Sequence, residues 1–264
     1  MRAAFRIRHV VTASFALRPG RSAALVLAAH GSVDPRSPAN AHAVAERVRR
    51  LRPWLDVRVG FCERSRPNLR DMLTGLRDDA IVVPLLLADA YHARVDIPAQ
   101  VAGTNAYQAD VLGEDPRLVT VLRQRLAVSR HDPNVGVIVV AVGSSWHEVN
   151  ERTRALAPAL AAGTRWKGAV TAFATGPRPT LDDAAHQLTG CGATRLVIAP
   201  WFLAPGRLTD RVASYAAGNG IAMASPLGAH PLVAATVLDR FDAATAEAPQ
   251  PARATTVAEP ARAA

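Results

Sequence analysis

The chain has 264 residues and a formal net charge of +9; 49% of its residues are hydrophobic, 20% are charged and 5% are aromatic. This composition is typical of a folded globular protein and excludes a chain that is disordered throughout. Two cysteines are too few for a disulfide scaffold, a four-cysteine zinc site or an iron–sulfur cluster held by this chain alone. No apolar run approaches the roughly 18 residues of a membrane-spanning helix, so we expect no membrane insertion.

The positive charge is concentrated at the N-terminus. Residues 1–22 hold five arginines and no acidic residue, so the rest of the chain carries +4, and we do not expect nucleic-acid binding. Residues 1–22 lack a convincing signal peptide and residues 247–264 are rich in Ala and Pro. We therefore predict a disordered basic extension, a disordered tail and a cytoplasmic protein.

Between these ends, short apolar runs alternate with amphipathic stretches. In chain order the first half predicts a strand at 23–29, a helix at 39–51, a strand at 57–61, a helix at 67–77, a strand at 81–87, a helix at 95–104, a short strand at 110–112 and a helix from Pro116. Strands that alternate with helices indicate an α/β fold, with a parallel sheet covered on both faces.

The second half repeats this order. Gly31 and Gly143 lie 112 residues apart in similar Gly-Ser motifs, and the Arg-Pro pairs that begin at Arg66 and Arg178 have the same offset. Further along, Gly113 and Gly228 lie 115 residues apart. We infer an internal duplication: two tandem α/β domains at 23–128 and 135–246, joined by a linker at 129–134.

Three side chains that suit metal binding follow the predicted strands of the first domain: His30, Glu63 and His92. Because the carboxyl ends of parallel strands open on one edge of a sheet, these residues are expected to converge. Two imidazoles and a carboxylate suit a divalent first-row metal and proton transfer near neutral pH. The second domain has Val142 and Thr175 at the positions that match His30 and Glu63, so the three residues are expected to serve function rather than folding.

Four segments carry a family resemblance: AAHGS, GFCERSRPNL, VVPLLLADAYHARVDIP and LGEDPRL. They resemble the class II tetrapyrrole chelatases of the sirohydrochlorin type, over roughly residues 23–245 and most specifically at 27–35 and 81–98. The resemblance implies two chelatase-like domains around a cleft and insertion of Fe²⁺ or Co²⁺ into sirohydrochlorin, without ATP, on the route to sirohaem or cobalamin. His30 and His92 would then bind the metal and accept protons, and Glu63 would assist.

The same resemblance suggests how the substrate is held. Sirohydrochlorin carries many carboxylates, which arginine binds well. Five arginines lie in the relevant loops: Arg36, Arg64, Arg66, Arg94 and Arg207. Two strand-to-helix turns, Gly31-Ser32 and Gly143-Ser144, could offer free backbone amides to an anion, although a turn that needs glycine for its geometry alone explains them equally well.

Other functions stay open at this point. A non-catalytic metal or tetrapyrrole carrier could use the same cleft, and two histidines with a carboxylate could hold the metal of a hydrolase. A Rossmann dinucleotide enzyme is disfavoured because the first turn reads HGSVDP and lacks G-x-G-x-x-G. We expect no permanently bound cofactor, and a monomer, because a duplicated chain can supply both walls of a cleft. His147 and His230 fall near predicted helix starts, where surface or capping roles are expected.

Overall fold

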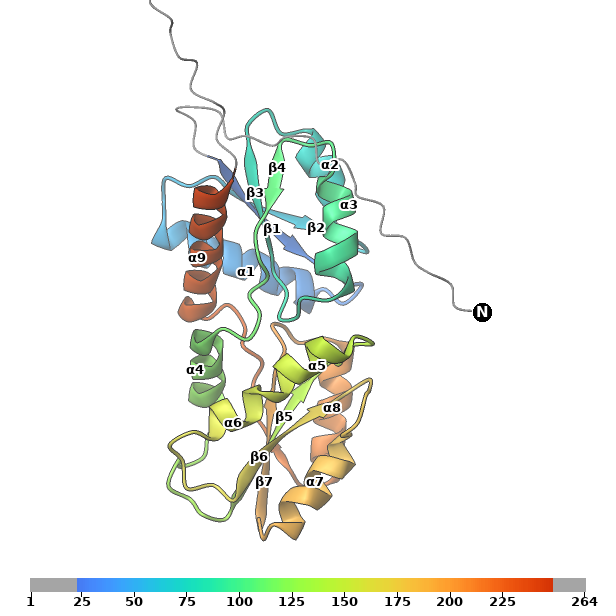
Figure 1. Ribbon diagram of the computed structural model, residues 1–264, viewed down its shortest axis with the longest axis vertical. Helices are drawn as coiled ribbons and strands as arrows, with labels where there is room; N and C mark the ends of the chain where they lie inside the picture. The colour runs from blue at the N-terminus through green and yellow to red at the C-terminus, as the bar shows by residue number, and fades with distance from the viewer. Residues whose placement is uncertain (1–22, 249–264) are drawn as a thin grey trace, which may run out of the picture.

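The computed structural model describes residues 23–248, which form two α/β units stacked end to end (Figure 1). The predicted N-terminal extension and all but the first two residues of the predicted tail lie outside this range. Each unit contains a four-stranded parallel sheet, in the order β2-β1-β3-β4 and β6-β5-β7-β8. The strands are β1 (Ala24–Ala29), β2 (Val57–Phe61), β3 (Ala80–Pro84), β4 (Ala106–Gln108), β5 (Val135–Ala141), β6 (Gly168–Phe173), β7 (Arg195–Pro200) and β8 (Ala222–Met223).

The central strands β1 and β5 form where the sequence offers short continuous apolar runs. Every residue of β1 and of β5 is buried, as expected for a central parallel strand covered on both faces. The predicted strand at 110–112 is wrong: β4 comes earlier, where Ala106 pairs with Ala80 of β3. Leu112 is fully buried in the core and donates its amide to the carbonyl of Leu86, so its apolar character reflects packing in the connection that follows the strand.

Helices cover both faces of each sheet, and several begin with a residue suited to capping. Asn68, for example, accepts the amides of Arg70 and Asp71 at the start of α2. The helices are α1 (Arg36–Leu51), α2 (Leu69–Thr74), the π-helical turn η1 (His92–Asp96), α3 (Ile97–Val101), α4 (Pro116–Arg125), α5 (His147–Arg154), α6 (Leu156–Ala161), α7 (Leu181–Gly190), α8 (Arg207–Gly218) and α9 (Pro231–Glu247). None of the helices formed by residues 23–248 combines the length and the apolar composition needed to span a lipid bilayer.

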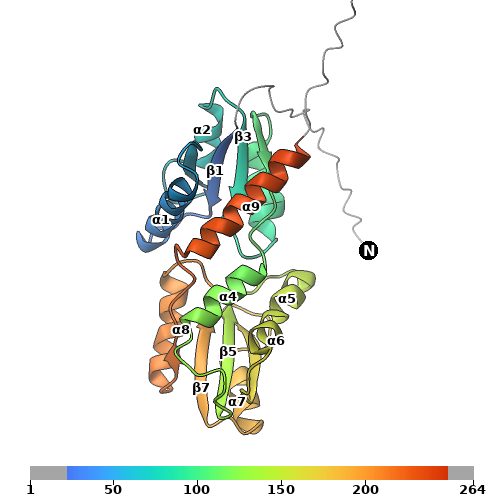
Figure 2. The ribbon, with the colours of Figure 1, turned by 90° about the vertical axis from the view of Figure 1, so that its left-hand side faces the viewer.

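The two units exchange their last helices. Helix α4 follows β4 of the first sheet but packs on α6 and β7 of the second, whereas α9 follows β8 of the second sheet but packs on α1 and β3 of the first (Figure 2). One hydrophobic core consequently runs through both units. The predicted division at 129–134 therefore separates the two sheets but not the helices that cover them.

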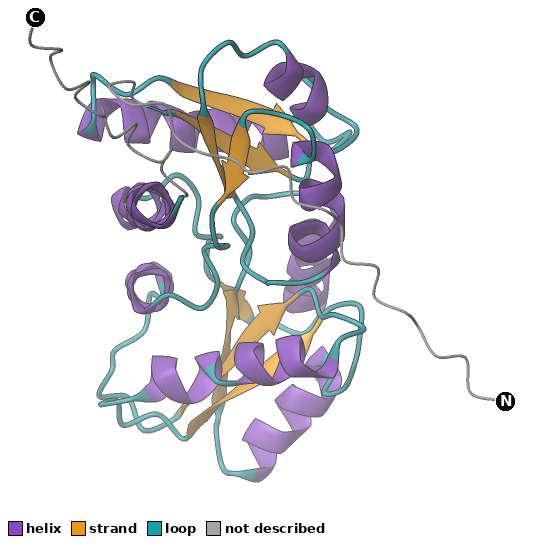
Figure 3. Cartoon of the chain, turned by 45° about the horizontal axis from the view of Figure 1, so that its top comes forward, coloured by secondary structure: helices purple, strands orange, loops and turns teal. Residues whose placement is uncertain are grey.

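Hydrogen bonding confirms the internal duplication. The strand β1 aligns with β2 so that Ala29 lies opposite Phe61, and β5 aligns with β6 so that Ala141 lies opposite Phe173, which gives the predicted offset of 112 residues twice. The strands of both sheets run toward the junction between the units (Figure 3). Their carboxyl edges, where the candidate residues lie, therefore face each other.

Candidate functional site

The three predicted residues lie at the carboxyl edge of the first sheet. His30 directly follows β1, Glu63 lies two residues beyond β2, and His92 opens the turn η1 after β3. The Glu63 amide donates to the carbonyl of His30 at 3.0 Å, which places the loops after β1 and β2 side by side. The topology therefore brings together residues that are distant in the sequence.

The imidazoles of His30 and His92 form an adjacent pair. Their ring centroids are 4.3 Å apart and their planes are nearly perpendicular, at 85°. The side chains are 43% and 33% exposed, so an incoming ion could reach both. Nε2 of His30 also lies 3.5 Å from Oε1 of Glu63.

Each imidazole is oriented by an oxygen at its Nδ1 atom. Nδ1 of His30 lies 2.8 Å from the carbonyl oxygen of Gly31, and Nδ1 of His92 lies 3.0 Å from Oδ2 of Asp96. A carbonyl or ionised carboxylate oxygen only accepts, so Nδ1 is the donor in each of these contacts, and in a neutral ring the lone pair is then on Nε2. This arrangement is typical of histidines that bind metals, whose second nitrogen is held by an oxygen acceptor.

Asp96 is a site residue that the sequence reasoning missed. It lies four residues after His92 in the π-helical turn, a type of turn that is frequent at functional sites. Its other oxygen accepts from Nε2 of Gln100 at 2.9 Å, so the carboxylate is held in place from both sides. The His-x-x-x-Asp spacing was the available signal, because residues four apart share a helix face, but the helix was predicted to start only at residue 95, after His92.

Glu63 reaches the same edge but does not complete a three-ligand site. Within residues 23–248, no group of three or more His, Cys, Asp or Glu side chains is arranged so that it could hold a metal ion. Oε1 of Glu63 instead accepts from Nε of Arg64 at 3.0 Å. Neighbouring Cys62 is buried, which raises the pKa of its thiol to about 12 and keeps it protonated. The structure therefore assembles the two imidazoles, while the predicted role of Glu63 as a ligand stays a prediction.

The Gly-Ser turns do not offer the free serine amides that the sequence suggested. The Ser32 amide donates to Oγ of Ser65 at 3.0 Å, and the Ser144 amide donates to Oδ1 of Asn150 at 2.9 Å. A backbone amide that already has a partner would have to give up that hydrogen bond to bind an anion. The two amides therefore do not support this prediction, and substrate binding by Ser32 and Ser144 stays a prediction.

The backbone conformation of these two turns requires glycine. Gly31 and Gly143 have φ angles of 88° and 96°, and a Cβ atom on either would lie 1.8 Å from a backbone carbonyl oxygen. Glycine is therefore required by the turn itself. A contact of either glycine with a substrate stays a prediction.

Of the five predicted arginines, two join the facing edges of the two units. Arg36 binds Asp34 of its own unit and Asp210 of α8, and Nη1 lies 2.9 Å from Oδ1 of Asp210. Hydrogen bonds from Arg36 lower the pKa of Asp34 to about 2, with a small further contribution from the nearby charge of Arg207. Arg207 itself is exposed at the start of α8.

Arg94 makes the second connection. Its guanidinium binds Asp89 of the first unit and approaches Glu148 of the second at 3.5 Å. It also lies over the ring of Trp146, 5.0 Å from the centroid, in a cation–π contact. Arg36, at the start of α1, and Arg94, in η1, thus link the facing edges of the two units.

The second unit has the same backbone arrangement as the site but lacks the metal-binding side chains. The Thr175 amide donates to the carbonyl of Val142 at 3.0 Å, the equivalent of the bond from Glu63 to His30. The sequence alignment of these positions is therefore confirmed. Val142 is 45% exposed, so the second unit presents an apolar side chain where the first presents an imidazole.

Comparison with protein families identifies the chain. The model of the CbiX family matches residues 24–129 and again residues 136–244. The chain belongs to the CbiX family. The two matched segments correspond to the two predicted tandem domains, so the duplication inferred from the offsets is also a duplication of the CbiX unit.

Two curated relatives of this CbiX chain come from Priestia megaterium. A sirohydrochlorin cobaltochelatase is 26% identical over 172 residues, which cover 59% of this chain and only 56% of that protein. A sirohydrochlorin ferrochelatase is 27% identical over 206 residues, which cover 72% of this chain and 76% of that protein.

Solved structures show the same fold. SirB from Bacillus subtilis with Fe³⁺ superimposes with a TM-score of 0.73 and 22% identity, over 86% of this chain and 97% of that one. The structure of CbiX, described as the terminal enzyme of sirohaem biosynthesis in denitrifying bacteria, gives a TM-score of 0.63, also at 22% identity, over 84% and 99%. Two chelatase-like domains in tandem are thus the fold of this chain.

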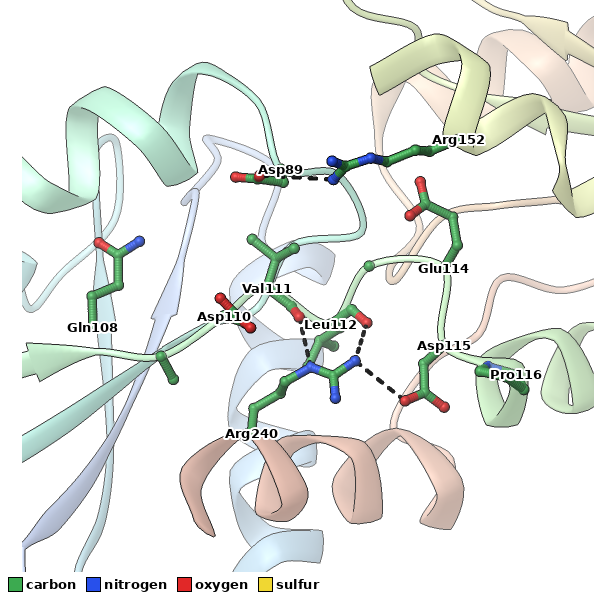
Figure 4. Close-up of a pocket in the computed structure, with 12 residues that line it drawn as sticks. Asp89, Gln108, Asp110, Val111, Leu112, Glu114, Asp115, Pro116, Arg152 and Arg240 are labelled. Carbon is green, nitrogen blue, oxygen red and sulfur yellow. Dashed lines mark hydrogen bonds and ion pairs between the residues drawn. The ribbon is translucent and has the colours of Figure 1, made fainter. Parts of the chain in front are cut away.

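The CbiX chain also has a polar pocket of about 570 Å³ beside the connection between β4 and α4 (Figure 4). It is lined from both units and does not include His30 or His92. Burial raises the pKa of Glu114, which receives a hydrogen bond from Thr153 at 3.3 Å. Arg240 of α9 donates to the carbonyls of Val111 and Leu112, so this pocket contains a structural anchor of the exchanged helix.

Proposed function

We propose that this protein inserts a divalent metal, Fe²⁺ or Co²⁺, into sirohydrochlorin, on the route to sirohaem or cobalamin. The observation that carries the proposal is the adjacent pair of half-buried imidazoles, His30 and His92, each with Nδ1 oriented by an oxygen acceptor. Membership of the CbiX family and the names of the two Priestia megaterium relatives indicate that the substrate is sirohydrochlorin.

The geometry suits what metal insertion demands. The enzyme has to hold the ion while the ion loses water, and it has to accept the protons that leave the pyrrole nitrogens. An imidazole with a free Nε2 lone pair can do either, because it is both a good ligand for first-row metals and a base near neutral pH. In this proposal His30 and His92 bind the ion and accept protons, and Glu63 assists by ligation or by orienting His30.

The macrocycle would lie between the facing edges of the two units. Its carboxylates need cationic partners, and the exposed guanidinium of Arg207 on α8 is the predicted arginine best placed for this role. Arg36 and Arg94 already bind carboxylates of the protein. We therefore assign substrate binding to Arg207 and the connection of the two units to Arg36 and Arg94.

The same proposal leads to expectations about cofactors, oligomeric state and cellular location. The metal is a substrate, so we expect no permanently bound cofactor and no use of ATP. One chain supplies both facing edges, which suits a monomer. We also expect a cytoplasmic protein without a nucleic-acid partner.

An anaerobic absorbance assay tests the proposal. Purified protein is mixed with sirohydrochlorin and with Co²⁺ or Fe²⁺ in separate cuvettes, and the rate is read against the spontaneous reaction. We expect multiple turnovers that disappear in His30→Ala and persist in His147→Ala, a histidine whose side chain is 84% exposed on α5. Tight binding of sirohydrochlorin or metal without any acceleration would overturn the proposal and favour a carrier.

A further inference from the structure

The loop between β2 and α2 has a counterpart in the second unit, between β6 and α7. The Phe61 amide donates to the carbonyl of Pro67 at 3.0 Å, and the Phe173 amide donates to the carbonyl of Pro179 at 2.9 Å. The arginines that precede these two prolines therefore occupy equivalent positions in the two units. Their side chains have different surroundings, which allows a comparison within one chain.

In the second unit, Arg178 binds a carboxylate of the protein. Its Nε and Nη2 donate to the two oxygens of Asp183, at 2.9 Å and 2.7 Å. Asp183 is held beside it by a reciprocal cap with Thr180, whose amide donates to Oδ2 of Asp183 at 2.8 Å. Hydrogen bonds from Arg178 hold the pKa of Asp183 well below its usual range. The guanidinium edge that suits a carboxylate best is thus already occupied.

In the first unit, Arg66 has no such partner. The equivalent aspartate is Asp71, but Asn68 caps α2 with its own side chain, by accepting the amides of Arg70 and Asp71, and does not draw the Asp71 carboxylate back. Among residues 23–248, neither the Arg66 guanidinium nor the Asp71 carboxylate has a hydrogen bond or an ion pair. Arg66 is therefore an exposed cation whose donors are free for a ligand.

A pocket of about 680 Å³ lies at this guanidinium. It is lined by Arg64, Ser65, Arg66, Asn68 and Asp71. The lining has two guanidinium groups and a single carboxylate, so its net charge is positive and favours an anion. Oγ of Ser65 donates to the carbonyl of Ser32 and accepts the Ser32 amide, both at 3.0 Å, which fixes the pocket to the loop that follows β1 and His30. The pocket thus lies beside the histidine pair, on the side of the edge strand β2.

We propose that Arg66 binds a carboxylate on the rim of the tetrapyrrole and thereby selects and orients the macrocycle. This inference rests on the proposed function. The metal enters at the centre of the ring, so a ring centred over His30 and His92 extends its rim, with its carboxylates, into the neighbouring loops. Arg66 then binds a substrate carboxylate in the way that Arg178 binds Asp183. Tetrapyrroles that lack a carboxylate at this position are bound less tightly.

Binding of sirohydrochlorin without metal tests the inference. Absorbance titrations give its affinity for the unchanged protein, for Arg66→Gln and for Arg178→Gln, the matched control in the second unit. We expect Arg66→Gln to weaken binding at least about tenfold, the usual effect of losing a hydrogen bond to a charged group. Arg178→Gln should bind like the unchanged protein, because Asp183 already occupies that guanidinium. Thermal unfolding shows that both variants are folded.

The insertion assay adds a second measurement. In Arg66→Gln the KM for sirohydrochlorin should rise while kcat stays near that of the unchanged protein, because a contact at the rim is the same before and during insertion. Equal binding by Arg66→Gln and the unchanged protein overturns the inference, as does an equal loss in Arg178→Gln. Binding that depends on Arg66 without turnover by the unchanged protein instead overturns the proposed function and leaves the carboxylate site in place.

Discussion

The imidazoles of His30 and His92 meet edge to face with 4.3 Å between their ring centroids, although one follows β1 and the other opens a π-helical turn after β3. Both rings have an oxygen at Nδ1 and leave Nε2 for an ion. The proposed reaction depends on this pair, which makes it the first target for mutation.

Removing either imidazole should abolish most metal insertion without unfolding the protein. His30→Ala and His92→Ala are each expected to lower the insertion rate by at least about 100-fold, because a positioned base alone contributes about that much. Both side chains are only half-buried, so little packing is lost. The rate is followed by absorbance, with His147→Ala as the control. An equal loss in all three variants would rule out a single site at His30 and His92.

The hydrogen bond between Asp96 and His92 should contribute to Co²⁺ affinity nearly as much as the His92 imidazole itself. Asp96→Asn is expected to weaken Co²⁺ binding by about 10- to 100-fold, because the amide no longer fixes the proton on Nδ1 of His92. The control is Asp242→Asn, which removes an exposed carboxylate that pairs with Arg52 far from the site. Titration calorimetry compares the two, and equal affinities would show that Asp96 does not orient the ring.

Gly31 should not tolerate a side chain. In Gly31→Ala the new Cβ would lie 1.8 Å from the carbonyl oxygen of Glu63, at a φ of 88°. We expect the free energy of unfolding to fall by more than about 2 kcal/mol, since the left-handed conformation alone costs about 1–2 kcal/mol. Gly218→Ala is the control: nothing lies within 4 Å of the new Cβ in helix α8, and stability should rise slightly. Urea unfolding measures both.

Arg240 should stabilise the exchange of helices between the units. From α9 it donates to the carbonyls of Val111 and Leu112 at 2.9 and 3.1 Å, and it also contacts Asp115. Arg240→Ala leaves two carbonyls without their donor, which should lower the free energy of unfolding by about 1–3 kcal/mol. Chemical denaturation should show this loss for Arg240→Ala and little change for Arg50→Ala, an exposed residue of α1. Equal stabilities would contradict the anchoring role.

The cap of α9 should make stability depend on pH. Nδ1 of His230 accepts the amide of Leu232 at 3.1 Å, and burial, followed by the charges of Arg125 and Arg47, lowers the pKa of His230 below its usual 6.5. The unfolded chain therefore binds more protons than the folded one as the pH falls through 6.5. This contribution to stability is complete above that pH and is lost below it.

The matched variant for this prediction is His230→Asn, which keeps a capping oxygen but does not titrate. The difference in unfolding free energy between about pH 8 and about pH 5 should be smaller for His230→Asn than for the unchanged protein. An identical pH dependence would show that protonation of His230 does not affect the cap.

Local patterns predicted the sheets well and the connections less well. The central strand β1 coincides closely with a continuous apolar run, because a strand covered on both faces needs such a run. The edge strand β2 includes the exposed Arg58, and β3 ends at Pro84, before the end of the predicted strand. The strand β4 was predicted too late in the chain, at 110–112. Leu112 is apolar because it is buried outside the sheet, and this apolar character predicted a strand. The partners of the serine amides were not predicted, because Ser65 reaches Ser32 from the loop after β2 and Asn150 reaches Ser144 from helix α5.

The sequence by itself determined the α/β class, the duplication and the placing of His30, Glu63 and His92 at one sheet edge, because alternating runs and strand ends are local features that a parallel sheet converts into position. Only the tertiary structure decided that α4 and α9 change sheets, that the two imidazoles lie in contact, and that Arg36 and Arg94 bind carboxylates of the second unit. These features depend on packing between distant segments, which no local pattern of residues specifies.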